Sequence, residues 1–466
     1  MSELPATVFV LYGATGDLAK RMVLPAFFDL YARGLLPQRW KLVGNGRGDV
    51  AHEDFRGHVR DVLTEFGTAP ADDQWASFSP DLLFAGGGFR KEDGGALPDL
   101  IEQTRTELGA DAQLIHYLAV PPSAFAPTTE ALKEHGLAAG TKVVYEKPYG
   151  TSLDSFHSLD TLVHSVFDEQ QVFRIDHFLG KEATQNVHML RFANTMIGGI
   201  WNREFIEEVQ IDVPETLDIA DRAAFYDATG AALDMLVTHL FQVAAEVAME
   251  PPLSFGPADL QEARESVISA FRPLDPADVV LGQFDGYRQT EGIADDSTTD
   301  TYVAAKLWVD TDRWRDVPFV LRTGKRLQGG AQRLSLLFRA PDGPLHSAGA
   351  LPEVLAFDLE GSGRILMELT VKDPGPDFVP NDVDHVLRLD QVADGSMAPY
   401  TSLIYDVVRG DRSLFTSTVG LEAAFTTFAP LLGPDRPAVV SYPEGTWGPP
   451  SADRLTGRFG WLLGRE

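Results

Sequence analysis

Residues 7–21 read TVFVLYGATGDLAKR, and this stretch decides which fold the N-terminal part of the chain is expected to adopt. The apolar run over residues 7–12 ends at Gly13. Residues 18–33 then carry large apolar side chains at helical spacing, and Gly34 stops the pattern. A strand that turns through glycine into a helix is typical of the start of an α/β sheet.

Later apolar runs repeat this alternation of strands and helices. They are KLVG (41–44), LIHYLAV (114–120) and KVVYE (142–146). Because strands joined through helices make right-handed crossovers, these runs predict a Rossmann-type, doubly wound parallel sheet. We expect this α/β domain to cover residues 1–172.

The remaining residues, 173–466, show a different periodicity. In TYVAAKLWVD (301–310) and RILMELTV (364–371), apolar side chains occupy every second position. A period of two is typical of antiparallel strands with one covered face. We therefore expect residues 173–466 to form an α+β domain with a large, mostly antiparallel sheet.

The composition narrows the class of function. The 466 residues include 68 acidic and 39 basic ones, and the formal charge of −29 argues against nucleic acid and anionic membranes as partners. The absence of cysteine excludes disulfides, thiolate metal sites and cysteine nucleophiles, and we expect no metal. The N-terminus has no signal-peptide pattern, and no uninterrupted apolar run approaches the roughly 20 residues of a membrane helix. We expect a cytoplasmic protein.

The glycine turn after the first strand is a candidate dinucleotide site. Gly13 and Gly16 have the spacing of the last two glycines of the dinucleotide fingerprint, and Leu11 stands where the first would be. Glycine lets the backbone approach a pyrophosphate at a helix N-terminus, although an ordinary strand–helix turn has the same pattern. The residues expected to line the cofactor here are Gly13, Ala14, Thr15, Gly16, Asp17 and Leu18.

The turn after the second strand, GNGRG (44–48), bears on the choice of cofactor. NAD sites usually hold an acidic residue here, whereas Arg47 suits a ribose 2′-phosphate and Thr15 could add a hydroxyl donor. Arg47 could equally be a solvated loop arginine. We expect NADP, and Asp49, two residues further on, leaves NAD open as a second cofactor.

The chain resembles the glucose-6-phosphate dehydrogenase family in three stretches that follow in order. They are GATGDLAKR (13–21), VVYEKPYG (143–150) and RIDHFLGKE (174–182). The resemblance continues through LRFANTMIGGIWNR (190–203), THLFQ (238–242) and DVPFVLRTGKRL (316–327), and so covers nearly the whole chain. RIDHxLGKE is highly specific, whereas EKP also occurs in other reductase families.

The resemblance implies a reaction and a set of site residues. The reaction is NADP-dependent oxidation of glucose 6-phosphate at C1 to 6-phosphogluconolactone. In it, Asp176 and His239 form a dyad with the histidine as general base. His177 and Lys181 would bind the phosphate, and Lys147 would lie between cofactor and sugar. The other residues that the resemblance assigns are Glu215, Asp234 and Lys325 to the sugar and Tyr117 to the cofactor.

The resemblance also implies a cis peptide bond before Pro148 and a homodimer or homotetramer joined through the large sheet. The chain departs from the family pattern at Phe178, where a tyrosine usually helps to hold the phosphate. It departs again at Gly330, where the family often has a second lysine, and in the segments AAFYDATG (223–230) and YTSL (400–403). Chemistry at C1 is therefore better supported than the identity of the sugar, and a second, structural NADP site is not expected.

Two other functions stay open. One is a Rossmann-type dehydrogenase of an unphosphorylated sugar, of the glucose–fructose oxidoreductase and inositol dehydrogenase class. The other is a catalytically silent NADP-binding regulatory subunit, against which the intact Asp176, His239 and Lys147 argue. Without the resemblance, His239 would be interpreted as a core histidine, and Glu215 and Asp234 as solvated carboxylates.

Overall fold

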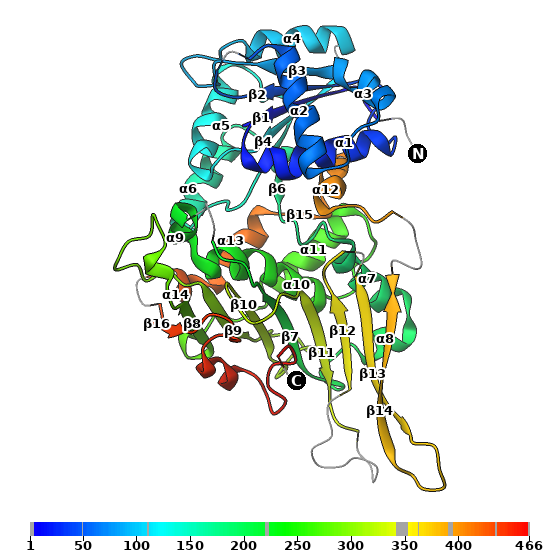
Figure 1. The fold of residues 1–466 in the computed structure, drawn as a ribbon. Coiled ribbons are helices and arrows are strands. Elements are labelled where there is room, and N and C mark those ends of the chain that lie inside the picture. The colour runs from blue at the N-terminus through cyan, green and yellow to red at the C-terminus, as the bar shows by residue number, and fades with distance from the viewer. Residues whose placement is uncertain are drawn as a thin grey trace. The chain divides into compact units, whose positions relative to one another are not determined.

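The computed structural model describes residues 4–48, 50–109, 111–219, 223–341, 353–361, 363–389, 395–433 and 436–464. The chain forms two compact units, whose elements are drawn in Figure 1. The first consists of Met1–Gly180, Ser254–Gln261 and Met397–Thr418, and the second of Lys181–Leu253, Glu262–Ser396 and Val419–Glu466.

The first unit is built on a seven-stranded sheet in the order β15-β6-β5-β4-β1-β2-β3. Strands β1 to β6 pair with one another in parallel, which confirms the predicted doubly wound sheet. Every side chain of β1 is buried, as expected for a strand covered on both faces. The bounds are β1 Thr7–Tyr12, β2 Trp40–Asn45, β3 Leu82–Ala85, β4 Gln113–Leu118, β5 Lys142–Tyr145 and β6 Val172–Ile175.

Helices pack on this sheet around an apolar core that includes Phe9, Phe27 and Phe55. The helix after β1 begins at Asp17, passes through a π-helical turn, η1, and ends close to Gly34, as predicted. The helical bounds are η1 Ala19–Val23, α1 Leu24–Ala32, α2 His52–Phe66, α3 Asp72–Phe78, α4 Leu97–Leu108, α5 Phe125–Glu134, α6 Leu153–His164 and α12 Pro399–Arg409.

A late segment of the chain returns to the first unit. Strand β15, Phe415–Thr416, pairs antiparallel with β6, and α12 contributes Leu403, Ile404 and Val407 to the core of this unit. Lys142 Nζ donates to the carbonyl oxygen of Val407 over 2.7 Å. The first unit therefore runs past residue 172 and takes in later residues, because β6 and these apolar side chains belong to its sheet and core.

The second unit contains a nine-stranded sheet in the order β14-β13-β12-β11-β7-β10-β9-β8-β16. Most neighbours are antiparallel, as predicted, but β7 with β10 and β8 with β16 are parallel. The bounds are β7 Ile206–Pro214, β8 Val279–Phe284, β9 Tyr302–Leu307, β10 Phe319–Gly324, β11 Arg333–Phe338, β12 Val354–Asp358, β13 Arg364–Lys372, β14 Pro380–Arg388 and β16 Val439–Tyr442.

Helices of the second unit include one long apolar segment, Phe225–Ala248. Its length and apolar composition would suit a membrane span, but nearly all of it is buried inside the fold, so it is a core element. Asp234 and His239 interrupt the apolar run, which is why the sequence shows no continuous stretch of this length. The bounds are α7 Glu182–Ala193, α8 Thr195–Ile200, α9 Ala223–Ala231, η6 Ala232–Leu240, α10 Phe241–Ala248, α13 Thr418–Thr427 and α14 Ala429–Leu432. The helix α11, Pro257–Ile268, begins in the first unit and ends in the second.

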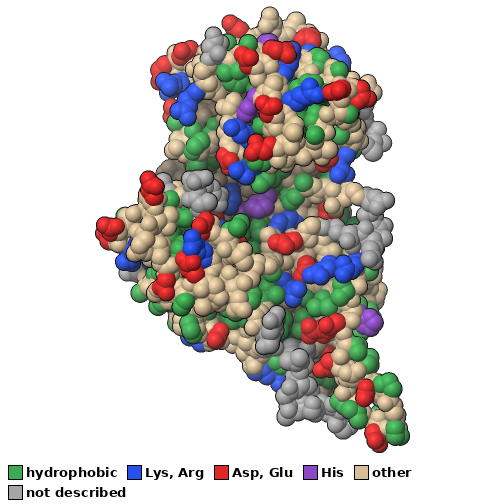
Figure 2. Space-filling view, in the orientation of Figure 1, with side chains coloured by type: hydrophobic (Ala, Val, Ile, Leu, Met, Phe, Trp, Pro, Cys, Tyr) green, Lys and Arg blue, Asp and Glu red, His purple; other side chains and the backbone are tan. Residues whose placement is uncertain are grey.

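The β13–β14 hairpin extends at the edge of this sheet, and Figure 2 shows hydrophobic side chains at its end. The alternating residues of β13 lie on one face, but they are covered only in part. Ile365 is buried, whereas Leu369 and Val371 are 42% and 43% exposed. The predicted antiparallel pairing is confirmed, and the prediction of a covered face holds only for the base of the strand.

Candidate active site

The turn after β1 fits the pyrophosphate of a dinucleotide. Gly13 has a φ of +71°, and a Cβ atom there would clash with the carbonyl oxygen of Ala119, so only glycine fits. Gly16 N donates to the carbonyl oxygen of Gly13 over 2.8 Å, which closes the turn just before the helix begins at Asp17. The turn thus brings backbone N–H groups and a helix N-terminus to one place, the combination that binds phosphates.

The turn after β2 lies against the first turn. Ala14 N donates to the carbonyl oxygen of Asn45 over 3.1 Å, and a Cβ atom on Gly46 would lie 3.7 Å from Thr15 Oγ1. Arg47 is exposed, residues 45–48 carry no carboxylate, and Asp49 lies outside the described residues. The Thr15 hydroxyl and the turn that carries Arg47 are therefore neighbours. Of the other residues expected here, Asp17 pairs with Arg21 over 2.7 Å, and Leu18 is half-buried.

Tyr117, expected at the cofactor, is fully buried and donates to Glu146 Oε1 over 2.6 Å. Tyr400 donates to Glu146 Oε2 over 3.3 Å. Burial raises the pKa of Glu146, although the two phenol hydrogen bonds oppose the rise. Glu146 directly precedes Lys147, whose peptide bond to Pro148 is cis, as the resemblance implies. Sequence reasoning missed Tyr400, because no local pattern connects it to the EKP motif.

RIDHFLGKE begins in β6 and continues past its carboxyl end, the edge where ligands bind in open α/β sheets. Asp176 is 3% exposed, and its Oδ1 atom accepts the backbone N–H of Phe178 over 2.9 Å. The His177 ring stacks on Tyr400, with centroids 6.4 Å apart and planes at 20°. Phe178, which stands where a tyrosine was expected, is only 2% exposed. Tyr400 therefore contacts both motifs of this unit, through Glu146 and through His177.

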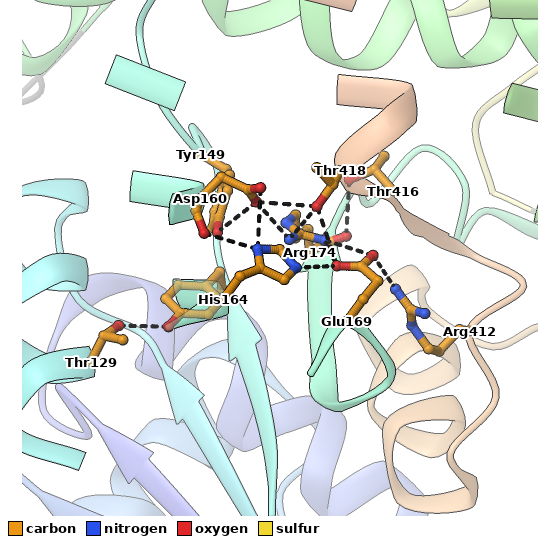
Figure 3. Close-up of polar contacts among 10 residues, drawn as sticks. Thr129, Tyr149, Asp160, His164, Glu169, Arg174, Arg412, Thr416 and Thr418 are labelled. Carbon is orange, nitrogen blue, oxygen red and sulfur yellow. Dashed lines mark hydrogen bonds and ion pairs between the residues drawn. The ribbon is translucent and has the colours of Figure 1, made fainter. Parts of the chain in front are cut away.

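The first residue of the motif, Arg174, is not a solvated charge. Its side chain is 2% exposed, with Nη2 2.9 Å from Asp160 and Nη1 3.0 Å from Glu169. The guanidinium also lies 4.7 Å from the ring centroid of Tyr149 and donates to Thr418 Oγ1 (Figure 3). Because Tyr149 lies two residues after Lys147, and Arg174 two residues before Asp176, this buried network fixes the backbone that carries both motifs.

In the second unit, the structure brings together Glu215 and Lys325. Glu215 follows β7 and Lys325 follows β10, and these strands are parallel neighbours, so both residues lie at the same edge of the sheet. Lys325 Nζ forms an ion pair with Glu215 and lies 5.7 Å from the ring centroid of Tyr226. The pair offers one donor and one acceptor side by side, which suits recognition of neighbouring hydroxyl groups.

Asp234 and His239 lie in η6, a π-helical segment. Hydrogen bonds in a π-helix join residues five apart, so these two residues lie one turn apart on the same side. Both side chains are buried, with exposures of 7% and 0%. Tyr226, whose ring lies near Lys325 Nζ, is buried as well, and burial together with the charge of Asp234 raises its pKa. Tyr226 was not among the predicted site residues.

Lys181, at the start of α7, donates to Gln332 Oε1. Gly330 follows Lys325 by five residues, and a Cβ atom there would lie 3.9 Å from Thr216. The loop thus has glycine at the position where the resemblance implies a second lysine, and the amide of Gln332 accepts from Lys181. Among the described residues, no group of three or more histidine, aspartate or glutamate side chains could hold a metal ion.

Comparison with known proteins identifies the family. The model for the NAD binding domain of glucose-6-phosphate dehydrogenase matches residues 10–186, and the model for its C-terminal domain matches residues 188–462. The chain is 38% identical to glucose-6-phosphate 1-dehydrogenase 2 of Mycobacterium bovis, covering 97% of this chain and 93% of that protein. It is 34% identical to glucose-6-phosphate 1-dehydrogenase 6, cytoplasmic, of Arabidopsis thaliana, covering 97% and 91%.

A solved structure, of a glucose-6-phosphate dehydrogenase in complex with its substrate glucose 6-phosphate, has the same fold along the full length of both chains. It is 30% identical, covers 100% of each chain and has a TM-score of 0.92. The two family models together span nearly all of the sequence. The chain therefore belongs to the glucose-6-phosphate dehydrogenase family.

Proposed function

We propose that this chain oxidises glucose 6-phosphate at C1 to 6-phosphogluconolactone, with NADP as the hydride acceptor. The observation that carries the proposal is RIDHFLGKE at the carboxyl end of β6, with Asp176 buried and His177 stacked on Tyr400. The structure of a relative with glucose 6-phosphate supports the choice of substrate. An unphosphorylated sugar is the alternative that the test below must exclude.

NADP is proposed because the turns after β1 and β2 suit two of its phosphate groups. The turn at Gly13 and Gly16 suits the pyrophosphate, and Arg47 with Thr15 suits the 2′-phosphate. When bound, the nicotinamide ring accepts the hydride that leaves C1. The residues of the chain orient the sugar and move the proton.

His239 is proposed as the general base that takes the proton of the C1 hydroxyl, and Asp176 as the carboxylate that orients its ring and stabilises the imidazolium. His177 and Lys181 would bind the phosphate, and Lys147 would lie between sugar and cofactor. Glu215, Asp234 and Lys325 would bind the sugar hydroxyl groups. The ion pair of Lys325 with Glu215 supports this role, because it holds a donor and an acceptor together.

The test is reduction of NADP by the purified chain on glucose 6-phosphate and on glucose. His239→Asn should lower kcat by at least about 10²-fold, the low end for loss of a general base, with little change in cofactor binding. The matched control is His157→Asn, because His157 is an exposed histidine of α6, away from the proposed site. Near-normal turnover of His239→Asn would remove this histidine from the mechanism, and a preference for glucose would overturn the substrate.

We also propose that the protein is a cytoplasmic homodimer or homotetramer. Exposed apolar side chains on the β13–β14 hairpin support an interface there, since Phe378 is 77% and Val386 is 48% exposed. A second copy would cover the alternating face of β13 that this chain leaves exposed. The cytoplasmic relative from Arabidopsis thaliana supports the location.

A further inference from the structure

We propose that Arg326 is a positioning residue that fixes the Lys325–Glu215 pair and thereby sets the affinity for the sugar. The inference rests on the proposed function, in which Lys325 and Glu215 contact the substrate. Arg326 itself points elsewhere, so its effect on binding acts through the backbone that it shares with Lys325.

The backbone of Arg326 has an unusual conformation. Its φ is +50°, in the left-handed region that residues other than glycine rarely adopt. Such a conformation persists only where the surroundings hold it. Here Arg326 N donates to the carbonyl oxygen of Leu217 over 3.1 Å, and the Arg326 carbonyl accepts Gly445 N over 2.9 Å. The segment after β10 is therefore joined to the segment after β7 on one side and to the segment after β16 on the other.

The side chain of Arg326 joins the same segments. Nη1 lies 2.6 Å from both carboxylate oxygens of Glu444, and Nη2 lies 2.8 Å from Asp218. The guanidinium also lies 5.2 Å from the ring centroid of Phe284. Asp218 lies shortly after β7, and Glu444 lies shortly after β16. The guanidinium of Arg326 therefore ties the segments after these two strands to the turn that carries Lys325.

The consequence for Lys325 follows from its own backbone contacts. Lys325 N donates to the carbonyl oxygen of Thr301 over 2.8 Å, and its carbonyl accepts the Tyr442 hydroxyl over 2.8 Å. Glu215 is held in the same way, because its N–H donates to Gly324 O and its carbonyl accepts Leu327 N, each over 2.9 Å. The two residues of the ion pair are thus fixed to each other through the turn that Arg326 keeps in its left-handed conformation.

A hollow of about 400 Å³ lies beside this turn, lined by Thr216, Asp218, Arg326, Glu444 and their neighbours. Close packing does not support the turn on that side, so the guanidinium and its two carboxylates stabilise it there in addition to the backbone hydrogen bonds. Removing the guanidinium should let the turn relax into the hollow and loosen Lys325 against Glu215. Interactions made equally in ground and transition states affect KM and leave kcat unchanged.

The experiment compares Arg326→Lys, Arg326→Ala and Arg326→Gly in the full chain. Arg326→Ala should raise KM for glucose 6-phosphate about tenfold, as for loss of one charge-assisted hydrogen bond, with kcat and the KM for NADP unchanged. Arg326→Gly should raise it less than Arg326→Ala, because glycine adopts the left-handed conformation without strain, and Arg326→Lys should restore part of the affinity by keeping the charge. The matched control is Arg272→Ala, since Arg272 is an exposed arginine of the same unit, paired with Asp310.

Amide hydrogen exchange of residues 324–328 is measured on the same proteins and tests the turn without any substrate. Faster exchange in Arg326→Ala and Arg326→Gly, together with the ordered rise in KM, is the expected result. Wild-type exchange and wild-type KM in both folded variants would overturn the inference. A wild-type chain that does not oxidise glucose 6-phosphate would overturn the proposed function and the substrate role of the turn, while the exchange data would still report whether Arg326 holds it.

Discussion

Replacing Asp406 with asparagine should stabilise the first unit, and more so at alkaline than at acidic pH. Asp406 lies near the C-terminal end of α12 and is 8% exposed. Burial, and then the charge of Asp411, raise its pKa to about 7, while Arg409, 3.6 Å away, opposes the rise only in part. The folded protein therefore has a carboxylate that is difficult to ionise.

The size of the effect follows from the two pKa values. The pKa rises from an ordinary 3.8 to about 7 on folding, a difference that corresponds to about 4 kcal/mol. Below pH 3.8 the carboxyl group is protonated in both states, so it does not lower the free energy of unfolding. As the pH rises from 3.8 to about 7, the unfolded chain loses the proton first, and about 4 kcal/mol of the free energy of unfolding is lost. Asparagine does not ionise, so Asp406→Asn should gain about 4 kcal/mol at pH 8.5 and about 2 kcal/mol at pH 5.5.

The assay is urea unfolding of wild type, Asp406→Asn and Asp411→Asn at both pH values. Asp411→Asn is the matched control, because it removes the neighbouring charge and leaves the carboxylate of Asp406 in place. It should therefore give a smaller gain at pH 8.5 than Asp406→Asn. An equal gain at both pH values, or a loss of stability at pH 8.5, would refute the view that a buried, repelled carboxylate limits stability here.

Three further changes test other features. Arg47→Ala should weaken NADP selectively, because a hydrogen bond to a charged group contributes about 1.5–3 kcal/mol, and equal weakening of NAD would show that Arg47 only organises its turn. Phe178→Tyr should lower KM for glucose 6-phosphate several-fold with little change in kcat, provided that the ring faces the phosphate, and an unchanged KM in the folded variant would contradict that orientation. Val371→Asp should shift sedimentation toward a smaller species if the exposed face of β13 is an interface, and an unchanged profile would exclude this residue from the contact.

Much of the fold was predictable because its signals are local. The run TVFVLY gives β1 at Thr7–Tyr12, and the alternation in RILMELTV gives β13 at Arg364–Lys372. The return of residues 397–418 to the first unit was not predicted, since the two-residue strand Phe415–Thr416 carries no period that would indicate its sheet. The exposure of Leu369 and Val371 was not predicted, because an alternating pattern shows that a strand has an apolar face but not whether other residues pack on that face.

The candidate site shows the same division. Its residues were identified from motif resemblance, and the pairing of Lys325 with Glu215 and the burial of Asp176 agree with those assignments without testing their roles. The π-helical segment with Asp234 and His239 could not be predicted, because its apolar pattern does not distinguish it from an α-helix. Tyr400 and Arg326 were missed because their contacts depend on segments far apart in the sequence.

The return of α12 and β15 to the first unit has a consequence for biosynthesis. On the ribosome, an N-terminal domain generally folds as soon as it has emerged. Here β6 remains an edge strand, and the core around Phe9 and Phe27 lacks Leu403, Ile404 and Phe415, until residue 416 has been translated. Nascent chains shorter than this should stay protease-sensitive and recruit chaperones, and a gene fragment that ends at residue 180 should not yield a stable cofactor domain.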